Sequence, residues 1–206
     1  IRHLATVRGL GRPIVVGNSQ GAPFALALAV GGVASAVAIV SGADEVALPE
    51  FADRLPEHLC NLVELTAKDP AEAERVFAEF DADRMWTMVM EGSPPCDRRV
   101  YEDPAFAEAY RRALEEGFAQ GSAGYARDTV LAMGKWPFDL GKIDVPVDIW
   151  YGEQDRSHSP DNGETLAGRI PGARRHLVPG IGGAVLWTEA ERILRTSLDA
   201  AGMTRT

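Results

Sequence analysis

The sequence predicts an α/β fold, with a mostly parallel sheet, flanking helices and an inserted helical cap. Four short segments rich in apolar, β-branched residues support this prediction, at residues 13–17, 34–41, 145–151 and 174–179. Their apolar residues are continuous rather than alternating, which is typical of strands buried on both faces of a parallel sheet. Helical sequence separates the first two segments and the last two, so we expect β-α-β crossovers in a doubly wound layer.

Helical sequence follows the first, third and fourth expected strands. Residues 21–30 are rich in alanine and leucine and lie between the first two strands. Residues 159–170 lie between the last two, with Ser159 as a candidate N-cap and Pro160 at the first helical position. Residues 187–201 follow the last strand and predict an amphipathic helix.

The middle of the chain predicts helices and no convincing strand. Asp69 begins a capping box with Glu72, and Asp103 precedes a proline at a second helix start. Because this helical stretch interrupts the sheet, we expect residues 45–140 to form a helical cap over its edge. Two segments would then form the core of the fold, residues 1–44 and 141–206.

The composition excludes several classes of partner and cofactor. The 206 residues are 46% hydrophobic and 25% charged, which is an ordinary globular balance. The net charge of −9 argues against nucleic acid and against anionic membranes, because both would repel the chain. Cys60 and Cys96 provide no disulfide framework, so we expect no signal peptide and a cytoplasmic protein. The four histidines are scattered, so we expect no metal and no organic cofactor.

The candidate nucleophile lies in residues 17–21, GNSQG, between the first strand and the first helix. This G-x-S-x-G pattern in a strand-turn-helix context is typical of a nucleophile elbow, where a sharp turn strains the serine backbone and lifts its hydroxyl above the sheet. We expect glycine at positions 17 and 21 because side chains there would collide with backbone. The helix N-terminus then offers the backbone N–H of Gln20 to an oxyanion beside Ser19.

The elbow and two later segments resemble the α/β-hydrolases with a helical cap, such as esterases, lactonases and proline-iminopeptidase-like proteins. Residues 145–155, VPVDIWYGEQD, are similar to the strand that ends in the triad acid of that family. Residues 170–173 and 176–180 resemble the helix end and last strand that precede the triad histidine. The resemblance covers nearly the whole chain and implies that Asp155 is the triad acid.

The resemblance also identifies a missing base. The family places its triad histidine in a segment like Gly-x-Gly-His, whereas residues 180–184 read GIGGA and Gly183 stands in the histidine position. Loss of the base from such a triad can lower kcat by about a millionfold. The glycine is therefore the mark of a weakened or non-enzymatic relative, an engineered change or a sequence error, and these alternatives stay open.

Other residues compete for the acid and base roles. Asp44, after the second strand, is an alternative acid, because some relatives place theirs on that loop. His158, three residues past Asp155, could lean toward the site, whereas His176 lies within the last strand and is expected to be structural. Two further histidines are expected on the surface or in packing, His3 and His58.

The resemblance further implies that the first strands of the family, and the loop that gives a second oxyanion donor, would precede Ile1. Without them, the strand at residues 13–17 would be an apolar sheet edge, which proteins normally cover. We therefore expect a preceding segment or a second copy of the chain to pair with this edge.

These observations support two hypotheses about function. The first is a serine hydrolase for a small-molecule ester, lactone or amide, with Ser19 as nucleophile, the Gln20 N–H as oxyanion donor and Asp155 orienting a base. As written, the lack of a histidine at position 183 would weaken it. The alternative is a non-catalytic ligand-binding or interaction protein on the same scaffold.

Overall fold

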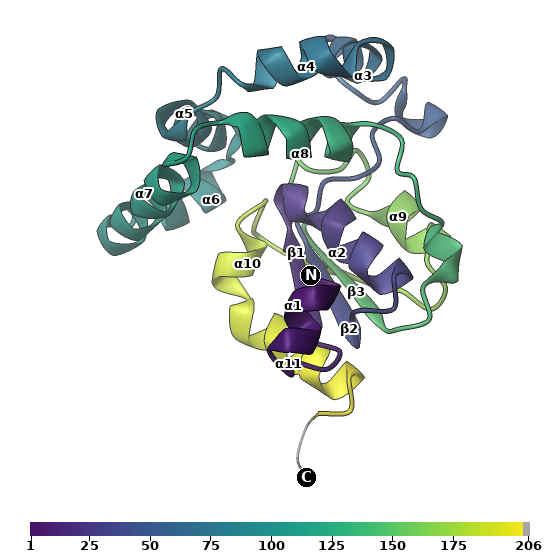
Figure 1. Cartoon of the computed structure of the whole chain (residues 1–206). Coiled ribbons are helices and arrows are strands. Elements are labelled where there is room, and N and C mark those ends of the chain that lie inside the picture. Colours follow the sequence, from purple (N-terminus) through teal and green to yellow (C-terminus); the bar gives the residue numbers. More distant parts are fainter. Residues whose placement is uncertain (204–206) are drawn as a thin grey trace.

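The computed structural model describes residues 1–203 and confirms the predicted α/β fold (Figure 1). Four parallel strands form one sheet in the order β1-β2-β3-β4. Each strand lies within two residues of its predicted position: β1 (Ile14–Asn18), β2 (Ala36–Val40), β3 (Val147–Gly152) and β4 (Arg174–Val178).

Helices cover both faces of the sheet and bury β2 and β3 completely, as the continuous apolar segments predict. The predicted burial is wrong for β4, in which three of five residues are exposed because it is an edge strand. On one face, α2 (Ala22–Val30) and α9 (Glu164–Arg169) pack on Ile149 and Tyr151 of β3. On the other face, α10 (Val185–Thr188) and α11 (Ala190–Ala200) contribute to the cluster around Trp150. All residues of β2 and β3 are buried, so these two central strands lie in the middle of the core.

Two predicted helices differ from those observed. α9 begins only at Glu164, because the Asp161 carboxylate accepts hydrogen bonds from the N–H groups of Glu164 (3.0 Å) and Thr165 (3.1 Å) and caps the helix there. Asn162, with a φ of 52°, keeps the preceding residues in a turn. The single helix predicted over residues 187–201 is also wrong, because the chain breaks at Glu189 between α10 and α11.

Six helices lie between β2 and β3 in the chain, and we call them the helical insertion. They are α3 (Glu57–Lys68), α4 (Pro70–Phe77), α5 (Ala82–Gly92), α6 (Pro95–Tyr101), α7 (Pro104–Phe118) and α8 (Ala123–Met133). The predicted caps are present, since Asp69 and Asp103 accept hydrogen bonds from the N–H groups of Glu72 and Phe106, both at 3.0 Å. Figure 1 shows the insertion at the end of the sheet where α2 begins. That residues 45–140 form a domain of their own stays a prediction.

Residues that flank the insertion tie it to the sheet. The buried carboxylate of Glu45 accepts a hydrogen bond from the N–H of Trp136 (2.7 Å) and forms an ion pair with Arg169 of α9. The Glu45–Trp136 hydrogen bond joins the two ends of the insertion, which lies between β2 and β3 in the chain. Among residues 1–203, no helix is long and apolar enough to cross a membrane.

β1 lies at one edge of the sheet and exposes apolar side chains. Its central residue Val16 is 37% exposed, whereas all residues of β2 are buried. The preceding helix α1 (Arg2–Val7) also exposes Leu4 and Val7. The expectation that another strand covers this edge stays a prediction.

Pairing of β1 with a second copy of the chain predicts a dimer in solution. Light scattering of the protein should give twice the mass of one chain, and Val16→Lys should give one chain mass, because a charge on an edge strand disfavours pairing. Leu131→Lys, at an exposed apolar residue of α8 (47% exposed against 37% for Val16), is the matched control and should leave the mass unchanged. A wild-type protein that scatters as a monomer contradicts the pairing.

Candidate active site

Ser19 lies at the joint between β1 and α2, in the strained conformation that the motif predicts. Its φ is 49°, and among residues 1–203 only two other non-glycine residues have a positive φ, Ser41 and Asn162. Such a conformation is costly for a residue with a side chain and is common at functional sites. The short 3-10 turn at Ser19–Gly21 then leads directly into α2.

The two glycines of the motif are not equivalent. A Cβ atom at Gly17 would lie 2.7 Å from the Cβ of Ala25 and 2.9 Å from the carbonyl oxygen of Gly21, so this position requires glycine. A Cβ atom at Gly21 would have no neighbour within 4 Å, so the prediction that this position also requires glycine is wrong. The reason is local, because Gly21 has helical backbone angles and its missing side chain points into open space.

Asp155 follows β3 at the same edge of the sheet, and its side chain is 1% exposed. Its carboxylate accepts a hydrogen bond from the N–H of Ser157 at 3.0 Å. Burial alone would raise the pKa of Asp155, but the hydrogen bonds and charge of His158, with the N–H of Ser157, outweigh burial and lower the pKa. Asp155 is therefore an ionised, buried hydrogen-bond acceptor.

His158 is the partner of that acceptor. Its Nδ1 lies 2.9 Å and 3.0 Å from the two carboxylate oxygens of Asp155, and its side chain is 23% exposed. Because the carboxylate accepts, Nδ1 carries a proton, and in the neutral form of the ring Nε2 is the basic nitrogen. The sequence placed His158 among several alternatives, and the structure places it on Asp155.

The imidazole of His158 occupies the space beside Gly183. A Cβ atom at Gly183 would lie 2.7 Å from Cε1 and 3.1 Å from Nδ1 of His158, and 3.6 Å from an oxygen of Asp155. A side chain at position 183 and the imidazole of His158 therefore cannot both occupy this space.

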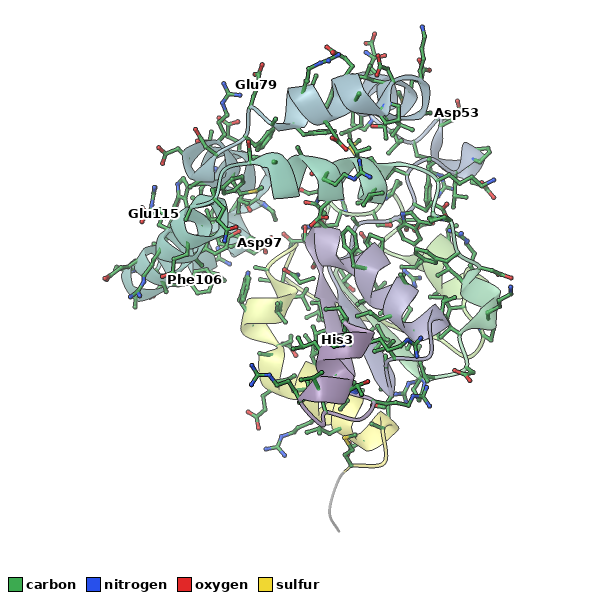
Figure 2. The ribbon with its side chains drawn as sticks, viewed as in Figure 1. His3, Asp53, Glu79, Asp97, Phe106 and Glu115 are labelled. Atoms are coloured by element: carbon green, nitrogen blue, oxygen red, sulfur yellow. The ribbon has the colours of Figure 1, made fainter. Side chains whose placement is uncertain are left out.

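A buried carboxylate from the helical insertion holds the loop that contains Gly183. Asp97 of α6 accepts hydrogen bonds from the N–H groups of Gly182 (2.7 Å) and Ala184 (3.3 Å), on either side of Gly183. Figure 2 labels Asp97 on the side of the insertion that faces the sheet. No sequence motif marks Asp97, because its partners are backbone groups far away in the chain.

Ser19 and His158 are connected through the loop that follows β2. The carbonyl oxygen of Ser19 accepts a hydrogen bond from the N–H of Ala43 (2.8 Å), and the carbonyl oxygen of His158 accepts one from the N–H of Asp44 (3.3 Å). Because Ala43 and Asp44 are consecutive, these bonds limit the separation of the two carbonyl oxygens to about 10 Å. The candidate nucleophile and the Asp155–His158 pair therefore share one end of the sheet.

Comparison with known proteins identifies the fold family of the chain. No family model and no curated protein matches the sequence. Among solved structures, the chain is similar to MGS-M2, an alpha/beta hydrolase enzyme from a deep-sea metagenome library, with 16% identity, a TM-score of 0.62, and 99% of this chain and 70% of that chain covered. The chain has the α/β-hydrolase fold.

Two further neighbours share this fold at similar distance. The enol-lactonase from Burkholderia xenovorans LB400 is 20% identical with a TM-score of 0.61, over 97% of this chain and 69% of that chain. Est816, described as an N-acyl homoserine lactone degrading enzyme, is 19% identical with a TM-score of 0.60, over 94% of this chain and 70% of that chain. At such low identities the similarity establishes the α/β-hydrolase fold alone.

Asp44, the alternative acid, has partners other than a histidine side chain. Its carboxylate accepts hydrogen bonds from the hydroxyl of Ser159 (2.9 Å) and from the N–H of Glu45 (2.8 Å). Burial raises the pKa of Asp44 to about 6, against the lowering effect of these hydrogen bonds. These contacts tie the loop after β2 to the loop after β3 and give Asp44 a supporting place beside the site.

The other residues singled out in the sequence either contact other partners or are exposed. The side chain of Gln20 donates a hydrogen bond to the hydroxyl of Thr129 in α8 (2.8 Å), so the elbow contacts the helical insertion.

His176 lies in β4 with Nε2 at 2.7 Å from the buried Asp148, away from the elbow, as expected of a structural histidine. The other two histidines, His3 and His58, are exposed. Among residues 1–203, no three His, Cys, Asp or Glu side chains are grouped to hold a metal ion.

The contrast between the two motif glycines predicts different effects on stability. Gly17→Ala should lower the free energy of unfolding by about 1–3 kcal/mol, because the new methyl group overlaps Ala25 and the backbone. Gly21→Ala should change it by less than about 1 kcal/mol, because its methyl group enters open space. Urea unfolding of the two variants beside the wild type measures both values, and equal losses would contradict the assignment.

The raised pKa of Asp44 predicts a pH dependence of stability. Between about pH 4 and pH 6 the folded protein keeps a proton on Asp44 that the unfolded chain releases, so stability from this group is lost as pH rises through 6. Relative to Asp44→Asn, the wild type should lose up to about 3 kcal/mol of unfolding free energy from pH 4 to pH 7. Urea unfolding across this range measures the difference, with Asp53→Asn at an exposed aspartate as the control (Figure 2). Parallel curves for wild type and Asp44→Asn would contradict the raised pKa.

Proposed function

We propose that this chain is a hydrolase that cleaves a small-molecule ester, lactone or amide with Ser19 as the nucleophile. One observation carries the proposal: Ser19 has a left-handed backbone at the end of a parallel strand, beside a buried carboxylate–imidazole pair on the same sheet edge. A strained serine at the start of a helix is the arrangement that presents a hydroxyl above an α/β sheet. The α/β-hydrolase fold of the chain supports the same reading.

In the proposed reaction, the Oγ of Ser19 attacks the substrate carbonyl carbon and gives up its proton to a base. The backbone N–H of Gln20, in the first turn before α2, would donate to the oxyanion that forms. The intermediate then collapses with loss of the alcohol or amine, and water hydrolyses the acyl group from Ser19. Asp155 would orient the base, and the reaction needs neither a metal nor an organic cofactor.

The helical insertion supports a substrate site above Ser19. The Gln20–Thr129 hydrogen bond joins the elbow to α8, and the hydroxyl of Ser157 donates to the carbonyl oxygen of Gly92 at the end of α5 (3.2 Å). The insertion therefore touches the loops on both sides of the proposed reaction centre. Its role as a cap that selects the substrate, and a cytoplasmic location, belong to the same proposal.

The proposal predicts a serine-dependent activity. The wild-type protein should hydrolyse a p-nitrophenyl ester and react covalently with a fluorophosphonate probe at Ser19, and Ser19→Ala should lower kcat/KM at least about a thousandfold and abolish labelling. Ester hydrolysis is followed by absorbance, and the labelled residue by mass spectrometry of the digested protein.

Ser41 provides a matched control for Ser19. It also follows a strand with a positive φ of 42°, but its hydroxyl is buried and has no hydrogen-bond partner. Ser41→Ala should therefore keep the activity and the labelling. If Ser19→Ala keeps the activity as Ser41→Ala does, Ser19 is not the nucleophile, and if the wild type shows neither turnover nor labelling at Ser19, the chain is the non-catalytic binding protein instead.

A further inference from the structure

We infer that His158 is the general base for Ser19, supplied by the same loop as Asp155 in place of a histidine at position 183. This inference rests on the proposed function and names the base that the motif pattern lacks. With His158 the site has a serine, a histidine and an aspartate, whereas Ser19 and Asp155 alone lack a base.

The first step of the argument is the geometry of the Asp155–His158 pair. Both carboxylate oxygens of Asp155 lie within 3.0 Å of Nδ1 of His158, and the carboxylate itself is buried. A buried carboxylate that accepts from Nδ1–H fixes the ring orientation and the tautomer, and it stabilises the imidazolium that forms when Nε2 takes a proton. An acid has this relation to a base in a serine triad.

The second step is the place of the imidazole. A Cβ atom at Gly183 would touch the ring of His158 and lie 3.6 Å from an oxygen of Asp155, so a histidine at position 183 would reach the same carboxylate through the same space. Gly183 and His158 are therefore complementary, because the glycine leaves the room that the imidazole fills. Glycine at position 183 is then required because it leaves room for the base, and it does not mark the loss of the base.

The third step is the proximity of the backbones of Ser19 and His158. Adjacent residues of the loop after β2 bind the carbonyl groups of Ser19 and His158, which keeps the two residues within about 10 Å at the carbonyl oxygens. The imidazole is 23% exposed while the carboxylate is 1% exposed, so the ring is the part of the pair that a substrate can contact.

The proton balance of the reaction is complete with these groups. Nε2 of His158 takes the proton of Ser19 as Oγ bonds to the carbonyl carbon, and Asp155 stays ionised. The imidazolium then gives this proton to the leaving alcohol or amine as that bond breaks. In the second half, Nε2 takes a proton from water as the water attacks the acyl carbon, and it returns a proton to Oγ as Ser19 is released.

The test compares His158→Gln with a matched histidine elsewhere. His158→Gln should lower kcat for a p-nitrophenyl ester by about 10²–10⁴-fold, because the general base is lost. His176→Gln removes a histidine that is also hydrogen-bonded to a buried aspartate, Asp148, but in β4, and should leave kcat within about twofold. Circular dichroism melting of each variant shows that the folded protein was assayed.

A relocation variant separates a base from a structural histidine. Gly183→His alone should lose activity, because its side chain overlaps the ring of His158. The double variant His158→Gly with Gly183→His should regain at least about tenfold over His158→Gly, because the new imidazole reaches the same carboxylate. A structural role for His158 predicts instead that folded His158→Gly keeps the wild-type kcat, so only a loss in His158→Gly followed by this recovery supports the base.

The outcomes distinguish this inference from the proposed function. If Ser19→Ala is inactive but His158→Gln stays within about threefold of wild type, Ser19 is the nucleophile and His158 is not its base. If His158→Gln does not fold, the relocation pair decides the question, and equal activities of His158→Gly and the double variant overturn the inference. If the wild type shows no Ser19-dependent turnover or labelling, the proposed function fails, and the inference fails with it.

Discussion

The parallel direction of the four strands is the constraint on which the candidate site depends. Parallel strands bring all their carboxyl ends to one edge, so the loops after β1, β2, β3 and β4 must pack against one another there. The packing is close: a Cβ atom at Gly152 would lie 2.2 Å from the carbonyl oxygen of Gly182. Because the backbones touch, small changes in one loop move the groups presented by the next.

Buried carboxylates hold these loops together. Asp44 joins the loop after β2 to Ser159, Asp155 orders its own loop around His158, and Asp97 binds the loop after β4 from the helical insertion. Buried charges are costly unless they are hydrogen-bonded, and each of these accepts at least two hydrogen bonds. The contact of Asp97 couples the insertion to the loop after β4, whose Gly183 lies next to the ring of His158.

In the proposed site, the base is on the loop after β3, whereas a histidine at position 183 would be on the loop after β4. His158 is three positions after Asp155, so their pairing depends on local geometry rather than on the docking of a distant loop. The loop around Gly183 is then free of a catalytic side chain and can be fixed by Asp97 instead. In the proposed site, the loop after β3 is therefore the one that must hold the base in place.

The sequence by itself determined the parallel sheet, the caps at Asp69 and Asp103 and the strained turn at Ser19, because each depends on residues close together in the chain. Only the tertiary structure decided which glycine of the elbow is needed, where α9 begins, and which histidine meets Asp155. Gly17 is constrained by Ala25 of the packed helix, and the space at Gly183 is visible only once His158 fills it. Local patterns fix backbone conformation, whereas the contacts between loops depend on how strands far apart in the chain are brought side by side.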